Sequence, residues 1–204
     1  MALYIISGTL AKYVSNVYAT DSARVAKFDY TVEGLDEETH EFSLFDTSSD
    51  TGVIGSASKL VAPGTDGSVS IEIENKSEVA IKAGFTLTET NSGNIPIVYE
   101  FGGNYYSSVL SETDTIKLHN SSSETVAIAG DLTDLATAIG DAAVLSKADG
   151  SEDSKTSLEL AWAWAFEGST GDQTDEGDTT LGETGTAEVS LRVDCDIEQL
   201  DVLP

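Results

Sequence analysis

Cysteine, histidine and positive charge are all scarce in this chain of 204 residues. Its one cysteine, Cys195, excludes an intramolecular disulfide, and its place in an alternating apolar run predicts a small buried side chain rather than a nucleophile. Ten basic residues stand against 36 acidic ones, for a net charge of -26. The chain lacks the basic footprint that nucleic acids and anionic lipid surfaces attract, so neither is an expected partner.

The acidic excess also makes the chain repel itself unless salt or bound cations screen the charge. A saline or cation-rich extracellular setting would supply that screening. The alternative interpretation is that the charge serves solubility alone.

Motifs that carry catalysis are missing from the sequence as well. The two histidines, His40 and His119, belong to no His-Glu-x-x-His arrangement and have no cysteine or histidine at metal-ligand spacing. The sequence holds no phosphate-binding loop, dinucleotide fingerprint or Gly-x-Ser-x-Gly elbow. It also has no apolar run long enough for a membrane-spanning helix. We therefore expect neither an enzyme nor a membrane-spanning protein.

What the chain does have is strict alternation of apolar residues with small or charged ones. The clearest runs cover residues 26–32, 79–87, 157–166 and 187–197. Side chains alternate between faces only in an extended strand, so each run predicts a strand with one buried and one wet face. The fold is expected to be all-β, most simply an antiparallel β-sandwich. The predicted core includes Phe28, Tyr30, Phe85, Trp162, Trp164, Phe166 and Val193.

Several further elements follow from the pattern. A helix is expected over about 132–145, with Asp131 as its N-cap and Asp134 in its first turn. Strands are also expected near 24–33 and 40–46, and a strand over 95–101 is expected at a sheet edge or to begin near Pro96. Residues 168–185 read as a long loop. No linker divides the chain, so we expect an arm over 1–13 and a single domain over 14–204.

Metal binding has only a weak candidate, in the loop over residues 168–185. Asp172, Asp175 and Asp178 put carboxylates on a glycine-rich stretch, and calcium prefers such oxygen ligands. The spacing does not match an EF-hand, and a solvated loop is the alternative. A sugar platform at Trp162 and Trp164 is weighed against core packing, and the shared apolar face favours the core. No cofactor is expected, with calcium left open.

Five segments occur in an order that carries a family resemblance. They are residues 7–13 (Ser-Gly-Thr-Leu-Ala-Lys-Tyr), 21–28, 62–64 (Ala-Pro-Gly), 162–168 (Trp-Ala-Trp-Ala-Phe-Glu-Gly) and 178–182. Together they resemble the secreted TasA/camelysin-like proteins of bacteria, which form biofilm matrix fibres and are related to archaeal surface pili. The resemblance implies a jelly roll, secretion to the cell surface or matrix, and head-to-tail polymerisation by donor-strand exchange. The donor would include Leu3, Tyr4, Ile5, Ile6, Leu10 and Tyr13.

Physical reasoning agrees with that implication. An apolar arm at one end of a chain can fill the open edge of another sheet, and a head-to-tail contact grows into a filament. We therefore expect a structural subunit of an extracellular filament whose main partner is itself, with accessory fibre or anchor proteins as further partners. The alternatives are a surface β-sandwich that binds a glycan or calcium, and a virion tail or decoration protein.

Overall fold

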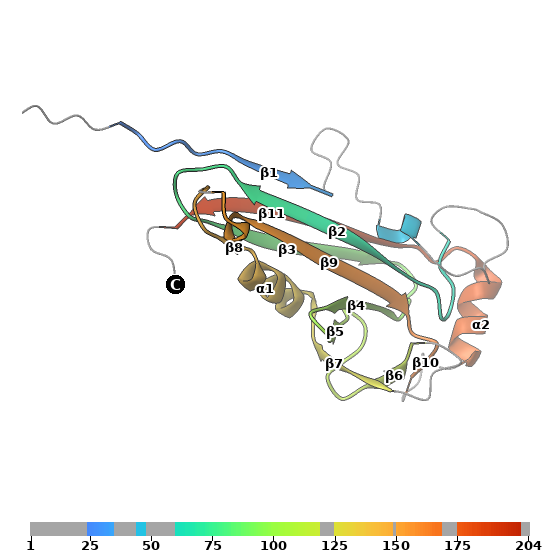
Figure 1. Cartoon of the computed structure of the whole chain (residues 1–204). Helices are drawn as coiled ribbons and strands as arrows, with labels where there is room; N and C mark the ends of the chain where they lie inside the picture. The colour runs from blue at the N-terminus through green and yellow to red at the C-terminus, as the bar shows by residue number, and fades with distance from the viewer. Residues whose placement is uncertain are drawn as a thin grey trace, which may run out of the picture.

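The computed structural model describes residues 24–34, 44–47, 60–118, 125–148, 150–168 and 175–200. Its strands form two sheets, and every strand pair is antiparallel except β5 with β7 (Figure 1). The larger sheet has the order β1 (Tyr30–Glu33), β2 (Asp66–Asn75), β9 (Lys155–Trp164), β4 (Ile97–Phe101), β5 (Asn104–Tyr106), β7 (Val126–Gly130), β6 (Thr115–Lys117) and β10 (Glu167–Gly168). The smaller sheet has the order β11 (Val189–Gln199), β3 (Ile81–Asn91) and β8 (Val144–Leu145). The prediction of a mainly β chain is confirmed.

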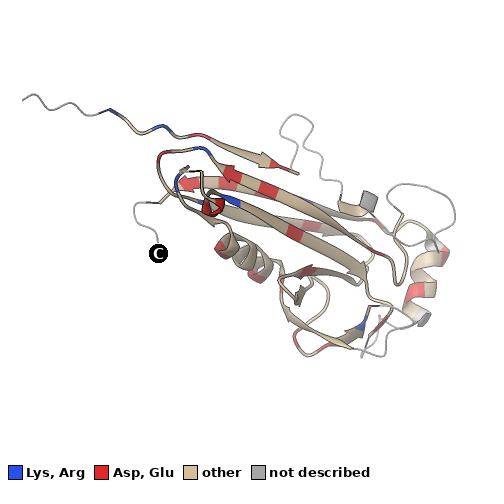
Figure 2. Cartoon of the chain, viewed as in Figure 1, with Lys and Arg blue, Asp and Glu red and all other residues tan. Residues whose placement is uncertain are grey.

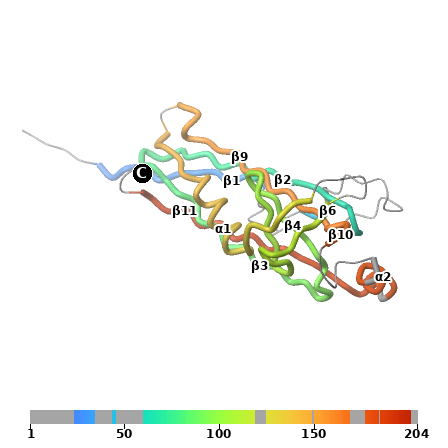
Figure 3. Tube along the Cα trace, turned by 90° about the horizontal axis from the view of Figure 1, so that it is seen from below, coloured from blue at the N-terminus to red at the C-terminus, as the bar shows by residue number. Residues whose placement is uncertain are grey.

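Two α-helices accompany the sheets in the described part of the chain. The first, α1 (Leu132–Ala142), begins as predicted with an Asp131 N-cap, and Asp131 and Asp134 form a reciprocal capping box. The second, α2 (Asp175–Thr184), lies where the sequence predicted only loop, so that prediction was wrong. Figure 3 shows α2 at one end of an elongated molecule, beyond the long strands. Two short 3-10 helices, η1 (Leu44–Thr47) and η2 (Glu152–Ser154), complete the elements.

The main core lies on the faces of β2, β9 and β4 that are turned toward β3 and α1. Its fully buried side chains include Ile71, Ile73, Ile81, Ile97, Tyr99, Leu135, Ile139, Leu160 and Trp162. Trp162 is 1% exposed, packs edge to face on Phe45, and donates its indole N–H to the carbonyl of Leu44 at 2.9 Å. The strand predicted over 40–46 is therefore wrong in its described part, because η1 turns inward here to supply that carbonyl and ring.

The predicted core residues divide by where they lie on the sheets. Trp162 and Trp164 are buried, which confirms core packing over a sugar platform. Phe85 and Val193 are partly buried and pack against the core, and Phe166 is partly buried. Phe28 and Tyr30 were predicted wrongly, since they are 47% and 37% exposed. They belong to an edge segment that borders β2 alone among the described strands, so no other described strand covers their rings.

A second, smaller core forms where the large sheet bends. Val98, Leu110, Ile116, Ile128 and Ala165 are buried together, on the opposite face of β4 from the main core. Figure 1 shows β5, β7, β6 and β10 turned away from the long strands β2 and β9. Pro96 directly precedes β4, which confirms a strand start. The edge position is wrong, because β4 lies between β9 and β5.

Candidate functional site

The predicted donor residues Leu3, Tyr4, Ile5, Ile6, Leu10 and Tyr13 lie outside the described residues, as do His40 and His119. The described chain begins at Arg24, in an extended segment that continues into β1. This segment is hydrogen-bonded to the turn after β2: the amides of Lys76 and Glu78 donate to the carbonyls of Asp29 and Lys27, at 2.9 and 3.0 Å. Residues 24–33 therefore act as one edge strand of the large sheet.

Charged groups attach the beginning of this edge segment, near Arg24, to the turn after β2. Both terminal guanidinium nitrogens of Arg24 donate to the carboxylate of Glu78, which also accepts the amide of Lys27 at 2.9 Å. These donors, Arg24 first, lower the pKa of Glu78 to about 2. Glu78 is ionised through the whole neutral range, so the edge segment stays attached there.

The same edge exposes apolar side chains. Val25 is 92% exposed, and the rings of Phe28 and Tyr30 pack edge to face with their centroids 5.7 Å apart. Apolar side chains on an uncovered sheet edge are unusual, since such edges tend to pair with other chains. This edge is suited to contact with another extended segment.

The smaller sheet has a second long edge at β11. All eleven residues of β11 pair with β3, and no other described strand borders it. Cys195 lies on β11 with its side chain partly buried against the core, and burial followed by the charge of Asp196 raises its thiol pKa to about 11. A thiol with this pKa stays protonated at neutral pH, so it is not activated as a nucleophile.

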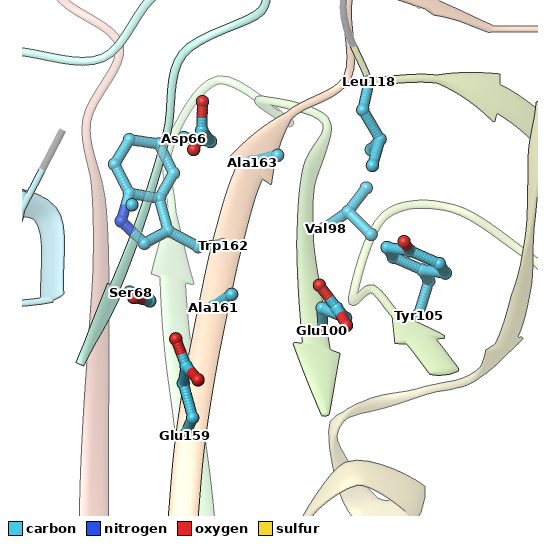
Figure 4. A pocket seen from close by; sticks show the side chains of 11 residues that line it. Asp66, Ser68, Val98, Glu100, Tyr105, Leu118, Glu159, Ala161, Trp162 and Ala163 are labelled. Carbon is cyan, nitrogen blue, oxygen red and sulfur yellow. The ribbon is translucent and has the colours of Figure 1, made fainter. Parts of the chain in front are cut away.

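A cleft of about 390 Å³ opens on the outer face of the large sheet, where the sheet bends (Figure 4). Its floor consists of the small side chains of Ser68, Ala161 and Ala163. Its apolar wall is formed by Val98, Tyr105 and Leu118, and its charged groups are Asp66, Glu100 and Glu159. Because none of the described residues that line it is a lysine, arginine or histidine, the cleft favours a cationic ligand over an anionic one.

The acidic character continues across the outer face toward β1. Glu33 on β1 lies directly opposite Glu72 on β2. Repulsion between these two like charges destabilises the pairing of the two strands. Glu74 is the exception, because Lys76 and Lys155 lie 3.4 and 3.3 Å from its carboxylate. Figure 2 marks the acidic residues in red along the sheets and both helices.

The weak metal candidates do not form a site in the described chain. Asp172 and the side chain of Asp175 lie outside the described residues, while Asp178 accepts the indole N–H of Trp164 at 3.2 Å from α2. Within the described ranges, no three residues of ligating type come together as a metal site would require. No helix in those ranges is long and apolar enough to cross a membrane.

The cleft was missed by sequence reasoning. Its signal was present as small residues at alternate positions, Ala161 and Ala163, where a half-buried strand usually shows larger polar groups. Which strands lie beside these alanines depends on pairing between distant segments, and the sequence pattern does not give it. Comparison with known proteins adds nothing to the site, since no protein-family model matches the chain and no curated protein is significantly similar to it.

Proposed function

We propose that this protein is a structural subunit of an extracellular filament, in which the N-terminal segment of one copy adds as a strand to a sheet edge of the next. The subunit is a jelly-roll-like β-sandwich, and residues 1–13 form the donor strand. The principal partner is another copy of the chain, with accessory or anchor proteins binding the finished fibre. No catalytic step is part of this role.

The observation that carries the proposal is the exposed apolar edge over residues 24–33. An added strand would pair with the side of β1 that no other described strand borders, and it would place its side chains beside Phe28 and Tyr30, which are both more than a third exposed. The apolar residues Leu3, Tyr4, Ile5 and Ile6 are well suited to cover those rings. Removing this apolar surface from water supplies the driving force.

The direction of the edge segment supports a contact between different copies. Figure 1 shows residues 24–29 continuing β1 beyond the long strands, so this edge segment projects from one end of the sheet. A contact between one end of a copy and a different surface of the next is heterologous, and it grows into an open filament unless the rotation closes a ring. Salt or cations would be needed to screen the net charge of -26 during assembly.

Deletion of residues 1–13 tests the proposal. Under screening salt, the full chain should sediment as filaments that are visible by electron microscopy, whereas the deletion variant should remain a folded monomer. Replacement of the edge rings by Phe28→Ser with Tyr30→Ser should weaken assembly in the same way. The matched control is Val109→Ser, at a similarly exposed apolar residue away from this edge, which should assemble normally. Filaments that persist without residues 1–13 would overturn the proposal.

A second candidate function, a surface binding module, is favoured by one observation, the cleft on the outer face of the large sheet. The test is direct binding of a defined ligand to the monomeric deletion variant. A glycan or calcium ligand would be detected by calorimetry, and the absence of heat with either would leave the filament role as the better account.

A further inference from the structure

The carboxylates of the cleft are arranged in steps along β9. In the first row across the sheet, Asp66 and Val98 lie on either side of Ala163. In the next row, Ser68 and Glu100 lie on either side of Ala161, and in the third row Glu159 lies opposite Ser70. Each row thus holds one carboxylate, and rows on one face of a strand are about 6.6 to 6.8 Å apart. Figure 4 shows Asp66, Glu100 and Glu159 at successive positions around Ala161.

This spacing equals the distance between same-face side chains of an extended peptide. In such a peptide, residues at i, i+2 and i+4 point the same way at intervals of about 6.6 to 6.8 Å. A peptide lying along β9 would therefore present its alternate side chains to successive carboxylates. The small side chains of Ser68, Ala161 and Ala163 allow its backbone to approach the sheet closely.

The apolar wall identifies the kind of side chain. Val98 is 2% exposed and contributes with Tyr105 and Leu118 to a wall beside the carboxylates. Lysine and arginine carry an aliphatic stem that packs on such a wall and a cationic head that reaches the charged groups. Within the described part of the chain, neither Glu100 nor Glu159 has a basic side chain within ion-pair distance.

The sequence argues that the occupant is a different polypeptide. None of the ten basic residues of this chain lies two positions from another, so no segment of a second copy presents the alternating basic pattern. The net charge of -26 further opposes the approach of a second acidic body and favours a basic one.

We propose that the cleft formed by β2, β9, β4 and Leu118 binds an extended segment of a partner polypeptide that carries lysine or arginine at alternate positions. The recognition is by β-face docking and ion pairing, and it is independent of the N-terminal segment. It therefore adds a heterologous partner site to the proposed filament subunit and does not require that the filament proposal hold.

The experiment measures fluorescence anisotropy of a labelled peptide, Gly-Lys-Thr-Lys-Thr-Lys-Gly, with the protein lacking residues 1–13 and, in parallel, with the full chain. The peptide should bind both, and binding should weaken as salt rises. An isomer with the three lysines adjacent, Gly-Lys-Lys-Lys-Thr-Thr-Gly, should bind about threefold more weakly. Its first and third lysines share one face, but its middle lysine points away from the sheet and loses its carboxylate.

Two variants locate the site. Glu100→Gln with Glu159→Gln should weaken binding of the alternating peptide about tenfold, since two ion pairs are lost. Ala161→Leu should weaken it without changing the charge, because the larger side chain fills the floor. The control, Glu112→Gln with Glu183→Gln, removes the same charge from exposed positions away from the cleft and should bind normally. Thermal unfolding of each variant checks that the fold is kept.

Three results would overturn the inference. They are equal binding of the two peptide isomers, unchanged binding after the cleft substitutions, or spermidine binding as tightly as the peptide, which would indicate a site for free cations. Loss of filaments in the cleft variants without added peptide would also overturn it, because the occupant would then be a second copy. If filaments persist after deletion of residues 1–13, the filament proposal is overturned but the peptide-binding inference is not. The two proposals are therefore tested independently.

Discussion

Tyr99→Phe should destabilise the protein by about 2 kcal/mol, because hydrogen bonds to charged groups contribute about that much. Tyr99 lies on β4 with no exposed surface, and its hydroxyl donates to the carboxylate of Glu89 on β3 at 2.6 Å. The bond joins the large sheet to the small one. Loss of the hydroxyl leaves Glu89 one donor short while the ring keeps its packing. For a chain of this size the melting temperature should fall by about 6 °C.

The matched control is Tyr106→Phe, at a buried tyrosine whose hydroxyl makes no hydrogen bond within the described part of the chain. It should change stability by about 0.5 kcal/mol or less. Both variants are compared with the parent chain by urea unfolding at neutral pH. Equal stability of the two variants would refute the reasoning that this hydroxyl holds the sheets together.

The hydrogen bond between Tyr99 and Glu89 should also make the stability of the protein depend on pH in the alkaline range. Burial first, and then the charge of Glu89, raise the pKa of Tyr99 well above its ordinary value of 10.0. A group whose pKa is raised by folding contributes stability below its unfolded pKa, and that contribution is lost as pH rises above it. The parent chain should therefore lose more stability than Tyr99→Phe when the pH rises beyond about 10. Parallel stability curves would contradict this.

Three further predictions concern the edge and the helix. Because Arg24 lowers the pKa of Glu78 to about 2 from an ordinary 4.5, attachment of the edge segment should be complete above pH 4.5 and lost as pH falls toward 2; amide exchange at Lys27 measures this, and Glu78→Gln should release the segment at neutral pH. Asp131→Ala should cost about 1 kcal/mol by removing the N-cap of α1, measured by urea unfolding, and Asp131→Asn should restore most of it. Gly34→Ala should expose the end of β1 to rapid exchange, because Gly34 has a φ of +94° and a Cβ there would meet the carbonyl of Ser70.

Much of the fold could be predicted from local patterns. Alternation located β3, β9 and β11, because the side chains of a strand with one buried and one exposed face alternate between apolar and polar along the sequence. Asp131 and Asp134 marked the start of α1 through capping chemistry that acts over a single turn. In these cases the deciding interactions lie within a few residues along the chain.

The errors arose where distant segments decide the outcome. Alternation placed Phe28 and Tyr30 on one face but could not show that they lie at a sheet edge, where β2 is the one described strand beside them and their rings are exposed. The α2 segment contains glycine, threonine and aspartate, which are weak helix formers, and Leu181 packing against the core helps to hold it. The cleft depends on which strands border Ala161, and pairing over such separations is not encoded in any local period.

Electron cryomicroscopy of the assembled protein tests the central claim most directly. The account predicts filaments in which an extended strand from residues 1–13 of one copy lies along residues 24–33 of its neighbour and covers Phe28 and Tyr30. A reconstruction in which that segment returns to the sheet of its own copy, or a protein that stays monomeric at every salt and cation concentration, would contradict it.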